Sequence, residues 1–261
     1  MGGRPVDSAY YDENYYLSDN DGYKEFGAGL DQNVHKKFFR ALKIMDPQKG
    51  KSVLDIGCGR GEIAYYCAQK GCKVKAVDYS QDAIKIAYKT VQKLPSEKRK
   101  LVSIEHKDIT EYESDEKYDL IFLIDVVEHL TQKQVLNLFK ILKRVLADNG
   151  KIFMSTPNSR YERYWYVFKH IMQWPLKPLK SMLRLLKGKM QAKNLREFLV
   201  KSFCVLPKKS KSLEIMHVNV MSPAQLRKSL SQHDLVADFF EGLKITDREI
   251  VAIIKKGEGS R

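Results

Sequence analysis

The sequence predicts an α/β protein built around a doubly wound, mainly parallel β-sheet. Short apolar runs of five to seven residues alternate with runs whose apolar positions recur every three or four residues, which indicates strands alternating with amphipathic helices. A loop with glycine or acidic residues follows each of the first four strands. Four strand–helix units with short loops specify such a sheet. With 261 residues and 43% hydrophobic content, the chain can bury one sizeable core.

The first strand is expected at residues 52–56, after a helix at 32–45 that Pro47 and Gly50 end. The loop Gly57-Cys58-Gly59-Arg60-Gly61 follows this strand and leads into the next helix. Glycine serves where the backbone turns tightly or a ligand presses against it. A strand, a glycine turn and a helix N-terminus form a cleft for a polar cofactor. The G-x-G-x-G spacing differs from the dinucleotide motif, so a nicotinamide cofactor is disfavoured.

The second and third strands, at residues 73–77 and 101–105, each end in an acidic loop. Asp78 follows the glycine loop by about twenty residues, where a carboxylate accepts hydrogen bonds from ribose hydroxyls. The alternative is that Asp78 caps the helix expected at 81–94, although Ser80 also suits that role. Asp108, after the third strand, is either a ligand contact or a solvated loop carboxylate.

The fourth strand, at residues 118–124, is fully apolar, as expected for a central strand covered on both faces. The segment Asp125-Val126-Val127-Glu128-His129-Leu130 follows it. A helix is expected at 132–146, with 148–150 as its turn and C-cap, and then a fifth strand at 151–155. Ser222-Pro223 reads as an N-cap and first position of a helix reaching residue 231, and strands follow at 235–240 and 249–254.

The net charge of +14 is concentrated in one segment. Fourteen Lys/Arg and two acidic residues lie between Arg160 and Leu213. Residues 159–216 therefore read as a basic, amphipathic helical insert, whereas residues 1–158 and 217–261 form the core. We weigh three roles for the insert: a lid docked over the substrate pocket, a contact with an anionic membrane surface, and a contact with nucleic acid. The tyrosine-rich residues 1–30 either cover the cofactor cleft or lie as an arm on the surface.

The glycine loop and the acidic strand ends resemble the motifs of class I S-adenosylmethionine-dependent methyltransferases. The resemblance implies a Rossmann-like, seven-stranded sheet whose last two strands form a reversed hairpin, with S-adenosyl-L-methionine as the cofactor. It implies that Asp55, Gly57, Cys58 and Gly59 lie near the amino-acid end of the cofactor. It places Asp78 and Tyr79 near the ribose, Asp108 and Ile109 near the adenine, and Asp125 and Val126 at the remaining cofactor contacts.

The Asp125–Leu130 segment is similar to that of ubiquinone-biosynthesis O-methyltransferases and of small-RNA 2′-O-methyltransferases, in which a Glu-His pair and a distant histidine accompany a divalent cation. The resemblance implies catalytic roles for Glu128, His129 and His217, and a metal site of these three with Asp125, where those groups carry Glu. Two alternatives stay open. His129 is a metal-free base, or Glu128 caps a helix while His129 packs.

These observations lead us to expect an O-methyltransferase that acts on a phenolic or sugar hydroxyl of a small, lipid-linked or nucleotide-linked acceptor. The alternatives are an RNA 2′-O-methyltransferase and a non-catalytic cofactor-binding module. The absence of C-x-x-C pairs among Cys58, Cys67, Cys72 and Cys204 favours free thiols in a reducing compartment. With no signal peptide or long apolar run, we expect a cytoplasmic protein, with peripheral attachment to the inner face of a membrane as the alternative.

Overall fold

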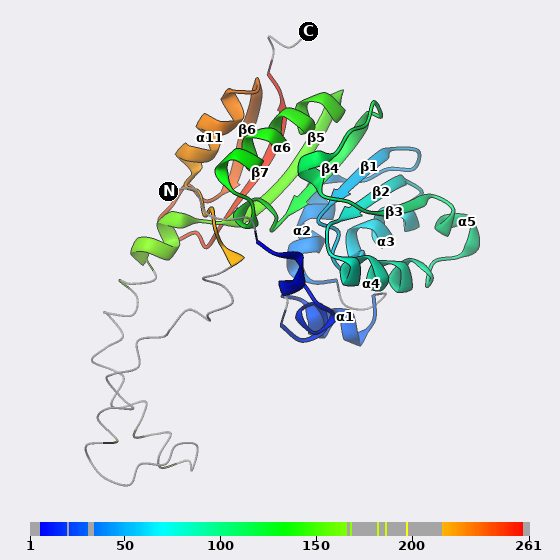
Figure 1. The fold of residues 1–261 in the computed structure, drawn as a ribbon, viewed down its shortest axis with the longest axis horizontal. Helices are drawn as coiled ribbons and strands as arrows, with labels where there is room; N and C mark the ends of the chain where they lie inside the picture. The colour runs from blue at the N-terminus through cyan, green and yellow to red at the C-terminus, as the bar shows by residue number, and fades with distance from the viewer. Residues whose placement is uncertain are drawn as a thin grey trace.

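A computed structural model of the chain describes residues 6–19, 21–30, 34–165 and 216–257, together with residues 168, 182, 186 and 197. Most of the insert expected at 159–216, together with Cys204, lies outside the described residues. The core is a seven-stranded sheet with the order β3-β2-β1-β4-β5-β7-β6 (Figure 1). The strands are β1 Ser52–Ile56, β2 Lys73–Asp78, β3 Val102–His106, β4 Tyr118–Ile124, β5 Leu146–Pro157, β6 Leu235–Glu241 and β7 Glu249–Lys256.

The register confirms the predicted topology. Strands β1 to β5 pair in parallel, whereas β7 runs antiparallel to both β5 and β6 at one edge of the sheet. The chain order reverses direction between β3 and β4, which flank the β2-β1 pair on opposite sides. Ligands bind in open α/β sheets at such a switch point, beyond the carboxyl ends of the strands.

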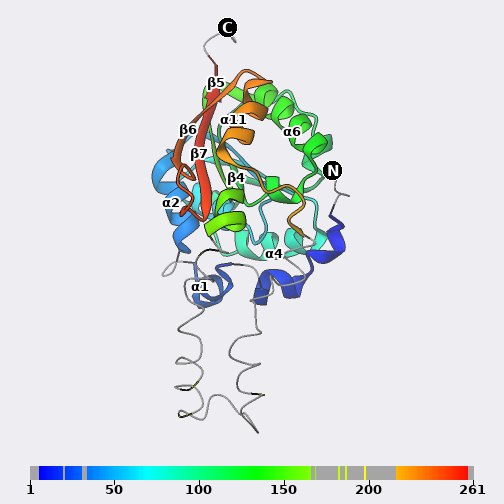
Figure 2. The same cartoon turned by 90° about the vertical axis from the view of Figure 1, so that its left-hand side faces the viewer.

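Helices cover both faces of the sheet. They are α1 Tyr23–Ala28, α2 Lys36–Met45, α3 Glu62–Gln69, α4 Gln81–Val91, α5 Ser96–Arg99, α6 Gln132–Val145 and α11 Pro223–Ser231. Figure 2 shows α2 on one side of the sheet, and α6 and α11 on the other. The alternation along β4 explains the two layers. Leu120 and Phe122 join the core that contains α2 and α3, whereas Ile121 and Leu123 join the core that contains α6 and α11.

Local sequence signals account for the helix ends. Ser222 accepts a hydrogen bond from the Gln225 N–H in a capping box, and Pro223 is the first residue of α11, as predicted. Ser80 caps α4 by accepting a hydrogen bond from the Ala83 N–H, which leaves Asp78 for another role. The helix expected from residue 32 begins at Lys36, and the one expected to reach residue 94 ends at Val91.

The predicted turn and C-cap at residues 148–150 are wrong. The helix α6 ends at Val145, and Leu146 is already extended and pairs with Tyr118 of β4. Leu146 is fully buried, so burial of its side chain against the core favours the extended backbone. A register shift between Tyr118 and Leu120 accommodates the extra residues. Glycine is needed at position 150 because the backbone there lies close to β4, and not because it caps a helix. A Cβ on Gly150 would lie 2.9 Å from the Tyr118 carbonyl oxygen.

Across the part of the chain that the structure describes, none of the helices combines the length and the apolar character that a bilayer crossing requires. Cys58, Cys67 and Cys72 are buried free thiols.

Candidate active site

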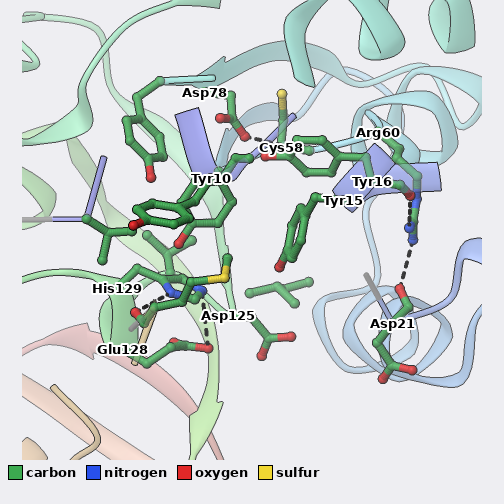
Figure 3. Close-up of a pocket in the computed structure, with 18 of the residues that line it drawn as sticks. Tyr10, Tyr15, Tyr16, Asp21, Cys58, Arg60, Asp78, Asp125, Glu128 and His129 are labelled. Atoms are coloured by element: carbon green, nitrogen blue, oxygen red, sulfur yellow. Dashed lines mark hydrogen bonds and ion pairs between the residues drawn. The ribbon is translucent and has the colours of Figure 1, made fainter. Parts of the chain in front are cut away.

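A cavity of about 1040 Å³ opens beyond the carboxyl ends of the central strands. Its lining comes from the N-terminal arm, the glycine loop after β1, the loops after β2, β3 and β4, and the start of β7. Figure 3 shows Asp78 and Cys58 at one end of this space and Glu128, His129 and Asp125 at the other, with the ring of Tyr15 between the two groups. One cavity therefore joins the predicted cofactor residues and the predicted catalytic residues.

The glycine loop needs its glycines for two reasons. Gly57, Gly59 and Gly61 have φ values of 67°, 49° and 78°, which L side chains rarely adopt. A Cβ on Gly57 would lie 2.6 Å from Cγ2 of Val126, and one on Gly61 would lie 3.0 Å from Ala87 of α4. The first contact keeps the loop close to the segment after β4, and the second lets α3 pack on α4.

Asp55 is one of the residues that line the cavity. It is buried, and its Oδ2 has no hydrogen-bond partner among the described residues. Burial and the neighbouring Asp78 carboxylate raise the pKa of Asp55 to about 7, although a hydrogen bond from the Ala64 backbone acts in the opposite direction. A buried carboxyl group that lines a cavity and has one oxygen without a partner is suited to a ligand with a positive charge or a hydrogen-bond donor.

Asp78 shapes the loop and also faces the cavity. Its Oδ2 accepts a hydrogen bond from the Gly59 N–H at 2.9 Å, and its Oδ1 accepts one from the Ser80 N–H at 2.9 Å. Burial raises the pKa of Asp78 despite these two bonds. Because each carboxylate oxygen has two lone pairs, the side chain retains acceptor capacity for ligand hydroxyls.

The loop after β3 supplies the residues expected around the adenine. Asp108 caps a short 3₁₀ helix at Ile109–Glu111 by accepting a hydrogen bond from the Thr110 N–H at 2.8 Å. Ile109 is buried, and Tyr79, Asp108 and Ile109 all line the cavity. The structure thus brings the predicted ribose and adenine residues to one wall.

The segment after β4 orients His129. The ring Nδ1 lies 2.9 Å from the carbonyl oxygen of Met216, which only accepts, so Nδ1 carries the proton and Nε2 presents its lone pair. Nε2 lies 4.0 Å from Oε1 of Glu128, and the rings of His129 and His217 have centroids 5.4 Å apart. Burial lowers the pKa of His129 to about 4, so the imidazole is neutral near pH 7.

Three of the four predicted metal ligands come together. Glu128, His129 and His217 each offer a ligand atom, and these atoms all lie within 4.8 Å of one another. Glu128 is almost fully buried and accepts a hydrogen bond from the Thr156 hydroxyl at 2.9 Å. Burial and the nearby Asp125 carboxylate raise the pKa of Glu128 well above its ordinary value. One carboxylate and two imidazoles suit Zn²⁺, Mn²⁺ or Fe²⁺, and a cation would have to displace the Glu128 proton.

Asp125 is not part of that group. Its backbone has a φ of 54°, and its carboxylate pairs with the ammonium of Lys37, which comes from α2. Lys37 also lies 3.2 Å from Oε1 of Glu249 at the start of β7. Sequence reasoning missed Lys37, because nothing in its local pattern distinguishes it from the adjacent Lys36.

The N-terminal arm is held against the site by Arg60, a second residue that the sequence did not single out. Arg60 is buried inside the glycine loop and donates hydrogen bonds to the carbonyl oxygens of Tyr16 at 3.0 Å and Asp21 at 2.9 Å. Its Nε pairs with Glu62 at 2.9 Å. The Tyr11 ring contacts His129 edge-on, with centroids 5.4 Å apart. Of the two interpretations of the arm, this geometry favours the one in which it covers the cleft.

These features fit S-adenosylmethionine. The molecule carries positive charge at its sulfonium and amino groups, which matches the partnerless Asp55 oxygen. The glycine loop lies so close to the opposite walls of the cavity that a Cβ on Gly57 would meet Val126 and a Cβ on Gly59 would meet Tyr16. Asp78 retains acceptor capacity for the ribose hydroxyls.

The same family assignment follows from comparison with known proteins. A family model described as a methyltransferase domain matches residues 28–237. The probable (S)-tetrahydroprotoberberine N-methyltransferase 2 of Papaver bracteatum is 34% identical over 122 residues, which are 46% of this chain and 32% of the relative.

Two ubiquinone biosynthesis O-methyltransferases give matches of similar identity. The Coxiella burnetii enzyme (strain RSA 493) is 32% identical over 130 residues, 48% of this chain and 53% of the relative. The Rickettsia akari enzyme is 33% identical over 140 residues, 52% and 53% respectively. These matches therefore span between one third and about half of the length of the relatives.

Solved structures share the fold. The N-methyltransferase NodS from Bradyrhizobium japonicum, in complex with S-adenosyl-L-homocysteine, has a TM-score of 0.56 at 15% identity, covering 95% of this chain and 93% of that one. The magnesium protoporphyrin IX methyltransferase from Synechocystis, with bound S-adenosylmethionine, has a TM-score of 0.54 at 15% identity, covering 94% and 89%. Because the family model covers most of the chain and the sheet ends in the reversed hairpin, this chain belongs to the class I S-adenosylmethionine-dependent methyltransferases and is related to the ubiquinone-type enzymes.

Proposed function

We propose that this chain transfers the methyl group of S-adenosylmethionine to a hydroxyl oxygen of a small, phenolic or sugar-containing acceptor, including lipid-linked and nucleotide-linked acceptors. The observation that carries the proposal is the neutral His129, whose Nε2 lone pair is exposed to the Glu128 side of the cavity while Met216 fixes the other ring nitrogen. A hydroxyl oxygen is a poor nucleophile until its proton leaves, whereas an amine needs less assistance. An oriented imidazole at this position therefore suits an oxygen acceptor.

The donor supplies an activated methyl group on a sulfonium, so the chain's own residues have to bind, orient and exclude water. Asp55, Asp78 and the glycine loop hold the donor. Tyr11 and the rest of the arm close the cavity above His129. His129 accepts the proton of the acceptor hydroxyl at Nε2. Because the pKa of His129 is lowered to about 4, this transfer needs a second group that stabilises the acceptor oxygen.

A divalent cation is one way to supply that stabilisation. Glu128, His129 and His217 would hold it, and it would act as a Lewis acid on the acceptor oxygen. His129 would then be a ligand instead of a base. A simple measurement distinguishes the cation from the metal-free base, because a chelator removes activity only if a bound cation is needed.

The test is a methylation assay on the full chain with S-adenosylmethionine, followed by detection of S-adenosylhomocysteine. The acceptors are catechol, a 2-polyprenylphenol, a nucleotide sugar, an RNA oligonucleotide and a benzylisoquinoline amine. We expect product with at least one phenol or sugar and its loss in His129→Asn. Methylation of the RNA or the amine alone would contradict the oxygen-acceptor proposal. Donor binding by calorimetry without turnover on any acceptor would favour the non-catalytic module.

We further propose that the basic residues between 159 and 216 bring the enzyme to an anionic surface, which would suit a lipid-linked acceptor. Co-sedimentation with vesicles of phosphatidylcholine and phosphatidylglycerol should fall when residues 166–210 are replaced by a Gly/Ser linker. Equal sedimentation of the two proteins would contradict this proposal. A gel-shift titration with RNA at increasing salt tests the nucleic-acid alternative.

A further inference from the structure

Lys37 is a largely buried cation at the end of the cavity that contains Asp125. It is only 12% exposed, and it lines the cavity together with Asp125 and Glu249. These two partners come from different elements, one following β4 and one at the start of β7. A buried ammonium held by two carboxylates from separate strands is positioned much more firmly than an exposed lysine.

The ammonium has more donors than partners. Lysine carries three N–H donors; one is hydrogen-bonded to Asp125, and the ion pair with Glu249 at 3.2 Å engages at most one more. No other hydrogen-bond or ion-pair partner of Lys37 is found among the described residues. The third donor is therefore available to a molecule in the cavity.

The surrounding charges keep Lys37 protonated. Burial alone would lower the pKa of the ammonium, but Asp125 and Glu249 outweigh this effect and raise the pKa above its ordinary value. The titratable groups around it are Asp125, Glu249 and, at longer range, Glu128. Asp125 is an electrostatic neighbour of both Lys37 and His129, so the ammonium and the imidazole lie at the same end of the cavity.

We propose that Lys37 binds the acceptor's hydroxyl oxygen and stabilises its anionic form. This inference rests on the proposed function and deepens it, since it assigns the group that lowers the pKa of the acceptor hydroxyl. The acceptor O–H bond breaks and its proton moves to Nε2 of His129. The oxygen lone pair then forms the bond to the methyl carbon, and the carbon–sulfur electron pair stays on sulfur, which becomes neutral. Lys37 donates a hydrogen bond throughout and loses no proton.

The assignment also gives the acceptor a chemical class. An ammonium near a hydroxyl favours ionisation most usefully when the hydroxyl is already weakly acidic, as in a phenol with a pKa of about 10. A sugar hydroxyl ionises far less readily and would gain less. The geometry therefore points to a phenol, with Lys37 and His129 sharing the work that a metal ion would otherwise do.

The experiment uses 4-nitrocatechol, a phenol whose anion absorbs at a longer wavelength than its neutral form. The probe is bound to the full chain with S-adenosylhomocysteine and a chelator, and its absorbance is followed from pH 5 to 8. We expect the ionisation constant of the bound probe to exceed that of the free probe by about tenfold or more, because an opposite charge at hydrogen-bond distance shifts a pKa by at least one unit. Lys37→Met should abolish this difference.

The matched control is Lys36→Met, which removes an exposed lysine from the preceding position of the same helix and should leave the difference intact. Lys37→Met leaves two carboxylates without their cation, so Lys37→Met with Glu249→Gln is the second variant and should also lose the difference. A probe that binds all variants and ionises identically in each would overturn the role of Lys37 while leaving the proposed function standing. A probe that does not bind the wild-type protein would overturn the phenol assignment, whereas the proposed function is decided separately by the methylation assay with phenol and sugar acceptors.

Discussion

Replacement of Asp55 by Asn should make the protein more stable and the donor bind more weakly. The Asp55 carboxyl is buried beside Asp78, and its Oδ2 has no partner among the residues that the structure describes. Ionisation of Asp55 is therefore unfavourable without ligand, which is why its pKa is raised from 3.8 to about 7. A positively charged donor reverses the balance, because it is attracted by the carboxylate and not by the neutral acid or an amide.

The difference between the two pKa values fixes the magnitude. Three pH units at 1.36 kcal/mol each correspond to about 4 kcal/mol for a fully buried group. Below pH 3.8 the folded and unfolded states both hold the proton, and above pH 7 both release it. Between these values only the folded state holds it, so the stability that Asp55 contributes is lost as the pH rises through this window. An asparagine cannot ionise and keeps the stability.

Two assays follow this carboxyl group. Urea unfolding at pH 5 and pH 8 should show Asp55→Asn gaining about 3 kcal/mol over wild type as the pH rises, because two of the three pH units of the window lie above pH 5. Calorimetry with S-adenosylmethionine should show the wild-type affinity rising about tenfold from pH 6 to pH 8, since the carboxylate fraction rises by that factor across a pKa of 7. The variant should bind weakly with no such slope.

Asp82→Asn is the control, because Asp82 is a half-exposed residue on α4 that does not line the cavity. It should keep the wild-type slope. A slope that survives in Asp55→Asn would assign the pH dependence of donor binding to another group. That result, or a flat wild-type affinity, would contradict a role of the Asp55 carboxylate in donor binding.

Four further predictions concern the rest of the site. Gly57→Ala should weaken donor binding at least tenfold by calorimetry, because its Cβ would lie 2.6 Å from Val126, and adding Val126→Ala should recover part of the loss while the strain of φ 67° remains. His129→Asn should lower kcat by about 10² to 10⁴ with an unchanged donor Kd, and an equal loss of donor binding would contradict its assignment as a base. Arg60→Ala should cost about 3 kcal/mol of unfolding free energy, since it leaves Glu62 buried and unpaired, and should speed chymotrypsin cleavage of the arm relative to Lys24→Ala. Mn²⁺ binding should release protons and weaken as the pH falls, because the pKa of Glu128 is raised. Glu128→Gln should bind Mn²⁺ at least tenfold more weakly than wild type. Unchanged Mn²⁺ binding would exclude Glu128 as a ligand.

Most of the fold could be predicted because each strand carries its own signal. β1 and β4 have the predicted bounds, since a run of apolar residues flanked by polar ones marks a strand covered on both faces. The turn at 148–150 could not be excluded from the sequence. Asp-Asn-Gly is a good turn locally, and only the pairing of Leu146 with Tyr118 and its burial make the segment extended. Tertiary packing overrode the local preference there.

The site was predictable where residues follow strands and unpredictable where they reach it from helices or the arm. Asp55, Asp78, Asp108 and His129 stand at or just beyond the ends of adjacent parallel strands, and the topology alone brings them together. Lys37 lies two residues into α2, and only the packing of that helix beside the sheet directs it toward Asp125. Arg60 sits between two glycines, where its own burial could not be foreseen from composition.

The hydrogen bonds of Arg60 connect the described part of the arm, residues 6–19 and 21–30, to the glycine loop. The Arg60 guanidinium donates hydrogen bonds from the glycine loop to the main chain at Tyr16 and Asp21, so one side chain links the donor-binding loop to the arm that covers it. A shortened protein that starts near residue 30 would expose the Arg60 guanidinium and would also lack the segment that covers the cavity. Removal of the tyrosine-rich arm to simplify protein production would therefore lower the methyltransferase activity of this chain.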